Sequence, residues 1–238
     1  MYCKPTALPS AECLSLTDVK LFLRLPNTYT AEDAFITALI QAAREHGETI
    51  TGRALAKRTW VQVMDSFPDR TFRHAIDGSS LYDLGLYGRP YGGSEHKRNS
   101  VELYYPPLIS VQNITYVDAN GAVQTLLPDT DFIVDRTNDF ARLTPIPGTL
   151  WPQTMHTLNA VAVNFTAGYD PDPTATDTHN VSTNPPDQQT TSTVVTGVLE
   201  LIRLGMLNLV AYWFQNRGSL TVPEPINSIL RSQAVYRF

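Results

Sequence analysis

TGVLELIRLGMLNLVAYWFQNR, residues 196–217, predicts a long apolar helix. At 1.5 Å per residue the helix would be about 33 Å long. Its apolar residues recur at helical spacing and are Val198, Leu201, Ile202, Met206, Leu209, Val210 and Trp213. Its polar residues share one narrow stripe interrupted by two leucines: Glu200, Arg203, Asn208 and Gln215, with Leu204 and Leu207 among them. A helix that is apolar over most of its circumference must be covered by other parts of the protein.

A membrane span is the first alternative for this segment. The uncharged run 204–214 is shorter than the roughly 20 residues that cross a bilayer. In addition, Glu200 and Arg203 precede that run by only about one turn. We therefore expect the helix to lie at the centre of a bundle or at a contact between subunits, with no membrane partner.

The composition is that of a protein with an ordinary core. With 238 residues, of which 42% are apolar, the chain can form one large domain or a domain that carries an insertion. A net charge of -5 argues against a nucleic-acid binder that neutralises phosphates. Because no basic region followed by an apolar run opens the chain, we expect it to be made and used in a cytoplasm. Cys3 and Cys13 are expected to be free thiols in that reducing compartment.

Two helices are predicted near the N-terminus. Ser15 or Thr17 offers an N-cap for a short first helix. A second helix is predicted to open with a capping box at Thr30, to run to about Thr51 and to stop at Gly52.

This second helix is predicted to be amphipathic. Its expected apolar face, which would pack against the 196–217 helix, comprises Ala34, Phe35, Ala38, Leu39, Ala42, Ala43 and Ile50. Its expected solvent-facing side comprises Thr37, Gln41, Arg44, Glu45 and Glu48. We expect the small residues Ala38 and Ala42 to permit a close approach between the two helices.

From about Thr59 the apolar period changes from 3.6 to 2, which indicates a β-rich section. Further strand candidates are 101–105, 111–117, 122–127, 131–135, 140–144 and 160–166. The clearest hairpin turns at Asp118-Ala119-Asn120-Gly121, where Asn-Gly can supply positive φ angles. Because no helical pattern separates the strands, we expect antiparallel pairing in a small sandwich or half-barrel.

Two irregular stretches interrupt this plan. Residues 68–100 are rich in Gly, Tyr and Arg and are too long for a simple hairpin loop. Both a partner-contact loop and a solvated insertion fit this composition, and the candidate contact residues are Tyr82, Tyr87, Arg89 and Tyr91. Residues 170–195 contain almost no apolar side chains, so we expect a flexible polar link.

The C-terminal part predicts a short helix through Ile226, Ile229 and Leu230. After this helix the chain ends in Val235-Tyr236-Arg237-Phe238, an aromatic and basic terminus. Such a terminus is either frayed or tied down on a partner, and the composition leaves both open.

No catalytic or metal-binding pattern stands out in the sequence. The five histidines are scattered without a second ligand at metal-site spacing, and the glycines form no phosphate-binding motif. The one dense acidic group lacks the glycine of a calcium loop and is better explained by solvated carboxylates: Asp129, Asp131, Asp135 and Asp139. We therefore expect a structural or binding protein that needs no cofactor, rather than an enzyme.

The order of the segments resembles the head-tail connector (adaptor, head-completion) proteins of long-tailed bacteriophages and related prophages. The resemblance covers nearly the whole chain. Its residues in the first half are 16–20 (LTDVK), 23–24, 33–45 (DAFITALIQAARE), 51–55 (TGRAL) and 59–60. In the second half they are 106–111 (PPLISV), 114–118, Gly121, Gly148, 151–152, 161–169, 213–217 and 235–238 (VYRF). The 68–100 insertion and the polar 170–193 stretch depart from the family pattern.

The resemblance implies an α+β fold. A small helical bundle, residues 14–55 and 196–231, would carry an inserted antiparallel β domain, residues 56–169. Residues 170–195 would link the two, and 232–238 would form a C-terminal tail. It further implies a dodecameric ring in the virion neck, between the portal and a stopper or tail-terminator protein, assembled in the bacterial host cytoplasm. DNA would pass through the lumen without specific binding, which suits an acidic protein.

The resemblance also assigns candidate contact residues. The tail residues Val235, Tyr236, Arg237 and Phe238 would touch the portal. A helix apolar on most sides could bury one side in its own bundle and another against the next subunit of a closed ring. The candidate bundle and subunit-contact residues are Glu200, Arg203, Leu207, Trp213 and Arg217.

Two alternatives stay open at this stage. The protein could form another head-completion ring, a stopper or a tail terminator. Alternatively, residues 56–169 could be a carbohydrate-binding or hydrolytic module in which Tyr82, Tyr87 and Trp151 form a sugar platform, although the carboxylate pair of a glycosidase is not identifiable.

Overall fold

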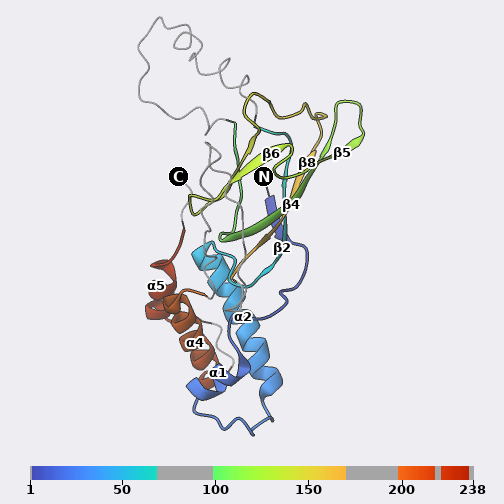
Figure 1. The fold of residues 1–238 in the computed structure, drawn as a ribbon. Helices are drawn as coiled ribbons and strands as arrows, with labels where there is room; N and C mark the ends of the chain where they lie inside the picture. The colour runs from blue at the N-terminus through green and yellow to red at the C-terminus, as the bar shows by residue number, and fades with distance from the viewer. Residues whose placement is uncertain (1, 69–98, 170–197, 218–220, 236–238) are drawn as a thin grey trace, which may run out of the picture.

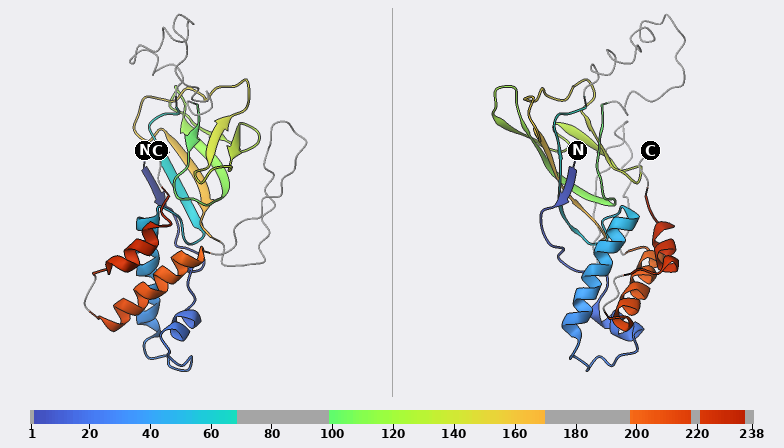
Figure 2. Two further views of the ribbon diagram at one scale, coloured as in Figure 1. Left: turned by 90° about the vertical axis from the view of Figure 1, so that its left-hand side faces the viewer. Right: turned by 180° about the vertical axis from the view of Figure 1, so that it is seen from behind.

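A computed structural model describes residues 2–68, 99–169, 198–217 and 221–235. The molecule is elongated, with its helices packed together at one end and its strands at the other (Figures 1 and 2). In chain order the elements are β1 (Tyr2–Pro5), α1 (Leu16–Phe22), α2 (Asp33–Thr51), β2 (Arg58–Met64), β3 (Val101–Glu102), β4 (Leu108–Val117), β5 (Val123–Leu126), β6 (Phe132–Asp135), β7 (Arg142–Pro145), β8 (Val161–Ala167), α4 (Glu200–Gln215) and α5 (Glu224–Arg231). The predicted α+β class with antiparallel sheets is confirmed.

The caps of the first two helices show which local signals operate. The Ser15 hydroxyl accepts a hydrogen bond from the Asp18 N–H at 3.0 Å, so Ser15 is the N-cap of α1. Gly52 ends α2 in the left-handed region at φ 67°, as predicted. The predicted capping box is wrong, because α2 begins at Asp33 after Glu32, which makes no side-chain capping bond.

The predicted faces of α2 need a correction. Ala34, Ala38 and Ala42 are exposed, whereas Arg44 and Glu48, expected to face solvent, are buried. The buried stripe of α2 comprises Ile36, Ile40, Ala43, Arg44, Gly47, Glu48 and Thr51. The apolar pattern misplaced this face because it counted alanine as core-forming and charged residues as solvated.

α4 is the helix predicted from residues 196–217, but it is shorter and spans Glu200–Gln215. It packs against α1, α2 and α5, with its buried side formed by Ile202, Gly205, Met206, Leu207, Leu209, Val210 and Trp213. Leu201, predicted to be internal, is 50% exposed, and Leu204 is also exposed. Gly205 permits α5 to pack closely against α4, since a Cβ there would lie 2.9 Å from Leu230 Cδ2.

The strands form two antiparallel sheets, one of five strands in the order β1-β2-β8-β4-β5 and one of three in the order β3-β7-β6. The β4–β5 hairpin is confirmed, with Val117 opposite Val123. Its turn uses a positive φ at Gly121 but not at Asn120. β1 was missed by sequence reasoning, because its four residues contain Pro5 and show no alternation strong enough to predict a strand.

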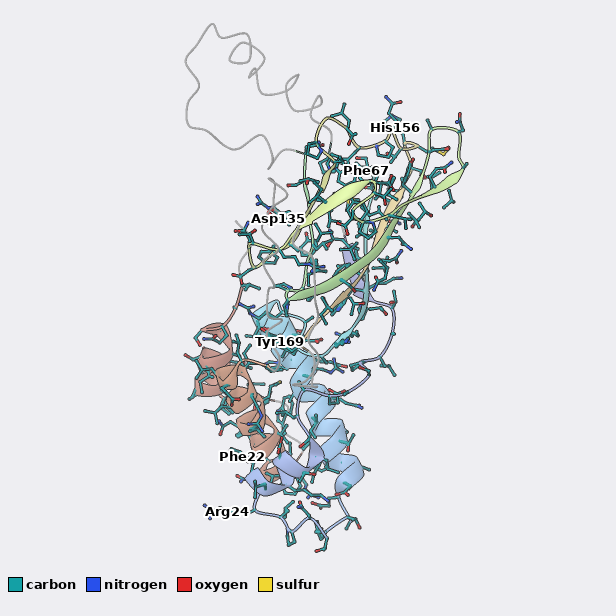
Figure 3. The ribbon with its side chains drawn as sticks, viewed as in Figure 1. Phe22, Arg24, Phe67, Asp135, His156 and Tyr169 are labelled. Carbon is teal, nitrogen blue, oxygen red and sulfur yellow. The ribbon has the colours of Figure 1, made fainter. Side chains whose placement is uncertain are left out.

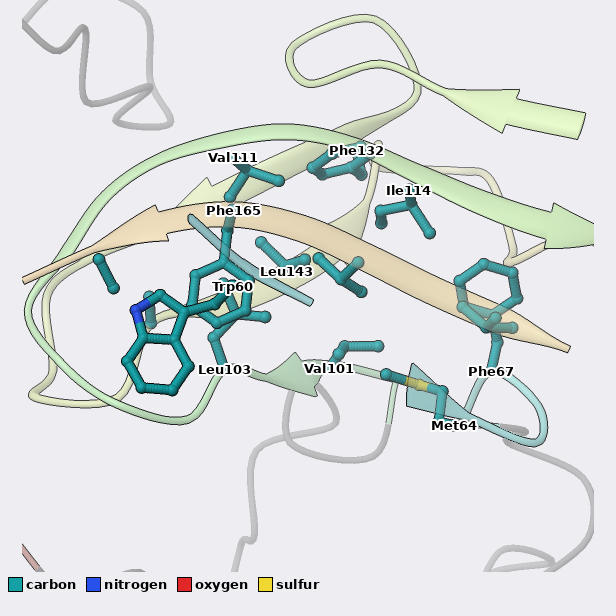
Figure 4. Close-up of a cluster of buried hydrophobic side chains, with 14 of the residues drawn as sticks. Trp60, Met64, Phe67, Val101, Leu103, Val111, Ile114, Phe132, Leu143 and Phe165 are labelled. Carbon is teal, nitrogen blue, oxygen red and sulfur yellow. The ribbon is translucent and has the colours of Figure 1, made fainter. Parts of the chain in front are cut away.

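Large aromatic and aliphatic side chains fill the core of the β region (Figure 4). Trp60 on β2 and Phe165 on β8 are buried opposite each other in the register. Phe67 and Trp151 stack with their ring centroids 4.6 Å apart. This core is separate from the helical one, which is built around α4.

Candidate assembly surfaces

Four charged residues meet where the helices join the sheet. Arg44 on α2 donates through Nε to Glu12 Oε2 at 2.8 Å, and its Nη1 lies 3.4 Å from Glu48 Oε2. The same Glu48 oxygen also contacts Arg58 of β2. The other oxygen, Oε1, accepts a hydrogen bond from the Leu55 N–H at 3.1 Å. The buried Glu48 carboxylate therefore forms ion pairs with two arginines and accepts a hydrogen bond from one backbone N–H.

Desolvation dominates the electrostatics of this cluster. Burial raises the pKa of the Glu48 carboxyl above its usual range, although Arg58, the Leu55 N–H and Arg44 act against that rise. Burial likewise lowers the pKa of Arg58, whose guanidinium lies 4.4 Å from the centre of the Trp60 ring. Because Glu48 comes from α2 and Arg58 from β2, the pair between them forms only when the helices and the sheet are docked.

The segment after α5 is attached to the C-terminal end of α2. Val235 N–H donates to the Thr51 carbonyl at 2.9 Å, and Arg53 Nε donates to the Gln233 carbonyl at 3.2 Å. A Cβ at Gly52 would lie 3.3 Å from the Val235 carbonyl oxygen. The C-terminal segment is therefore tied down on its own chain as far as Val235.

The candidate contact residues of α4 differ in their environment. Arg203 Nη2 lies 3.0 Å from Asp18 Oδ2 on α1 and its Nη1 lies 3.7 Å from Glu200. Leu207 and Trp213 are buried, so their side chains fill this chain's own bundle rather than a subunit surface. Sequence reasoning could not separate these cases, because an internal face and a subunit-contact face are both apolar.

Arg217 lies just after α4 and connects the C-terminal end of α4 to the N-terminal end of α2. It pairs with Glu32, and its guanidinium lies 5.1 Å from the ring centres of both Phe35 and Phe214. Its side chain stays more than half exposed. Glu200 and Arg217 are thus the exposed residues of the predicted set, and Arg203 is half-buried.

Other predicted contact residues lie outside the described residues. These are Tyr82, Tyr87, Arg89 and Tyr91 of the 68–100 insertion, and Tyr236, Arg237 and Phe238 of the tail.

Exposed apolar side chains lie at both ends of the molecule. Leu21 and Phe22 project at the helical end, and Leu150 and Leu158 lie in the loop between β7 and β8. In Figure 3, Phe22 and His156 mark these opposite ends. Single exposed apolar side chains are normal on protein surfaces, whereas large contiguous apolar patches are typical of contacts with other proteins.

Both cysteines are free, and burial raises the pKa of each thiol to about 12. At pH 8 the thiolate fraction would then be about 10⁻⁴, against roughly a quarter for an unperturbed thiol. We expect the folded protein to react with a thiol-specific disulfide reagent at least about 100-fold more slowly than the unfolded chain. Rapid native labelling of two thiols per chain would contradict the burial of Cys3 and Cys13.

Within the described ranges, no three His, Cys, Asp or Glu side chains come together as possible metal ligands. No helix of that same part of the chain is long and apolar enough to cross a membrane.

Residues 14–78, which include α1, α2 and β2, match the family of the phage gp6-like head-tail connector proteins. The match covers about a quarter of the chain. The resemblance seen in the sequence is thereby confirmed. No curated protein matches the chain significantly.

Solved structures show the same fold over the full length of the chain. A chain from the neck of an empty gene transfer agent (GTA) particle, computed with C6 symmetry, matches with a TM-score of 0.62 at 16% identity. A chain from the virion of a native GTA particle gives the same values. Both matches cover 100% of this chain and 97% of the other. A chain from the neck of a native GTA particle, computed with C12 symmetry, has a TM-score of 0.59, 14% identity and the same coverage.

Proposed function

We propose that the protein is a structural component of the neck of a tailed phage or phage-like particle, where copies form a ring between portal and tail. The family match across α1, α2 and β2 carries this proposal. The full-length fold similarity supports it, since the similar chains come from necks computed with sixfold or twelvefold symmetry. A closed ring of identical subunits requires two unlike contact surfaces on each copy. This role requires no catalytic residue.

The proposed position gives the ring three neighbours. The portal would lie on one side, a stopper or tail-terminator protein on the other, and DNA in the lumen. The net charge of -5 favours a lumen that does not hold DNA. Assembly would take place in the host cytoplasm, and the ring would remain in the neck of the virion. Imaging of the ring with its neighbours distinguishes an adaptor, which touches the portal, from a stopper or a tail terminator.

The domain organisation belongs to the same proposal. Residues 14–55 and 196–231 would form the bundle, 56–169 the inserted β domain, and 170–195 the link between them. The bundle would provide ring contacts through exposed side chains of α4 and its flanks, including Glu200 and Arg217.

We assign portal binding to the tail, residues 232–238, and specifically to its last three residues. Gln233 is held by Arg53, and Val235 by Thr51 at the end of α2. A contact made by residues 236–238 would therefore start from a fixed point. Such pre-organisation lowers the entropic cost of binding. Val235 was also predicted from the sequence to touch the portal. In this proposal it instead holds the tail on α2, through its hydrogen bond to Thr51.

Truncation after Val235 is expected to leave the thermal unfolding midpoint unchanged and to weaken portal binding at least about tenfold, since aromatic and arginine side chains dominate interface energies. Replacement of Tyr236, Arg237 and Phe238 by alanine keeps the chain length and should have the same effect. Binding to immobilised portal protein measures both variants. Wild-type affinity in both would remove the tail from the portal contact.

The carbohydrate-binding alternative loses one of its three proposed aromatic residues. Trp151 is only 9% exposed, stacks on Phe67, and donates through Nε1 to the Asn99 carbonyl at 2.9 Å. A sugar platform needs an exposed aromatic face, which Trp151 does not offer.

A further inference from the structure

The outer edge of β5 has backbone groups directed away from its own sheet. Asp118 N–H donates to the Ala122 carbonyl at 2.8 Å, so these residues form a bonded pair at the start of the hairpin. Bonded pairs alternate along an antiparallel ladder, and therefore Val123 and Thr125 direct their N–H and C=O groups away from β4. No strand in the described part of the chain pairs with this edge.

Within the ranges that the structure describes, this edge lacks the usual protecting devices. β5 contains no charged residue and no proline, and Val123 is 72% exposed. Natural proteins normally block such an edge with a charge, a proline or a covering segment. The end of the edge is closed, since Asp131 Oδ2 accepts the Leu127 N–H at 2.7 Å. The β4–β5 hairpin also projects beyond the other strands (Figure 1).

The opposite edge of the same sheet is β1. Thr6 N–H donates to the Thr59 carbonyl at 3.0 Å, so the alternation directs the backbone groups of Cys3 and Pro5 outward. Pro5 has no N–H, which leaves Cys3 as the outward donor within β1. This edge is therefore short, and Cys3 is the residue of β1 whose N–H and C=O groups can both bond to another strand.

The two edges complement each other between copies of the chain. β1 and β5 are the first and fifth strands of an antiparallel sheet, so they run in the same direction. Rotation about a ring axis would thus place β5 of one copy parallel to β1 of the next. Lys4 is the charged residue of β1, whereas acidic residues flank β5: Asp118, Asp129 and Asp131. A two-fold contact of β5 with β5 would instead bring acidic groups together.

We propose that β5 of each copy adds to β1 of the neighbouring copy as a parallel strand pair, an inference that rests on the proposed ring. The Cys3 N–H donates to the Val123 carbonyl, and the Cys3 carbonyl accepts the Thr125 N–H. Gln124 then lies beside Cys3. The register agrees with the packing, since Cys3 and Leu126 both lie against the core of the β region.

The same register places Lys4 of one copy beside Thr125 of the next on the other face, where both side chains are exposed. We expect the double variant Lys4→Cys with Thr125→Cys to form disulfides between copies when assembled rings are oxidised. Each copy carries both partners, so non-reducing electrophoresis should show a ladder of covalent multimers. Both variants also carry Cys3→Ser, because the native Cys3 thiol would lie beside a cysteine at position 124 in this register. The matched control is Lys4→Cys with Gln124→Cys in that background, which places the two thiols on opposite faces and should give little ladder.

Three outcomes would overturn the strand pairing: intact rings without a ladder, equal ladders in both variants, or a covalent dimer alone, which indicates a two-fold contact. Thr125→Pro provides a second check, because it removes the outward N–H without removing a bond to β4. It should lower the fraction of protein in rings, whereas Thr125→Val should not. If the wild-type protein forms no rings even with its portal, the proposed function fails as well, and electron microscopy of the mixture reveals this separately.

Discussion

Leu209→Asp should prevent the helical region from folding. Leu209 lies in the middle of α4, is 0% exposed, and belongs to the core that α4 forms with the other helices. The substitution removes a buried leucine and introduces a carboxylate with no partner, and we expect a loss of at least about 4 kcal/mol. That is a large part of the total stability of a typical domain. Soluble yield and thermal unfolding followed by circular dichroism measure the effect.

Gln215→Asp is the matched control for this substitution. Gln215 is the last residue of the same helix and is exposed. A surface change of this kind typically alters the free energy of unfolding by less than about 0.5 kcal/mol. If both variants unfold like the wild type, α4 does not have the central role in the bundle that its burial indicates.

Glu48→Ala should lower the free energy of unfolding by about 3–5 kcal/mol, because it leaves two buried guanidinium groups without their shared carboxylate. Glu48 pairs with Arg44 and Arg58 and accepts the Leu55 N–H, so it connects α2 to the sheet. Chemical denaturation monitored by tryptophan fluorescence measures the change.

Glu45→Ala tests whether burial, rather than charge alone, is responsible. Glu45 lies on the same helix 3.5 Å from Arg44, but its side chain is 71% exposed. We expect a change below about 1 kcal/mol, as for other exposed ion pairs. Glu48→Gln, which keeps an acceptor for the Leu55 N–H, should fall between the two alanine variants. Equal losses for Glu45→Ala and Glu48→Ala would mean that the buried cluster does not stabilise the docking of helices and sheet.

Local signals in the sequence predicted the elements well. The Ser15 cap, the Gly52 stop and the hairpin at Asp118–Gly121 each depend on a few neighbouring residues. β1 could not be found in this way, because its stability comes from pairing with β2, about 60 residues away in the sequence.

The candidate contact sites were only partly predictable. Apolar spacing identified α4 as a helix that needs cover on several sides, but it could not tell that Leu207 faces its own bundle and that Leu201 and Leu204 remain exposed. That distinction depends on which neighbours the helix meets. The open edge of β5 was likewise invisible, because an edge exists only once strand order is known.

The sequence by itself determined the α+β class and most helix and strand positions, since these follow from periodicity and caps. The tertiary structure alone decided which face of each element is buried. Arg44 and Glu48 illustrate the physical reason. A charged side chain is solvated unless the fold brings an opposite charge to it, and here those charges come from Glu12 and Arg58. Pairing between distant segments therefore reversed what the local pattern of α2 indicated.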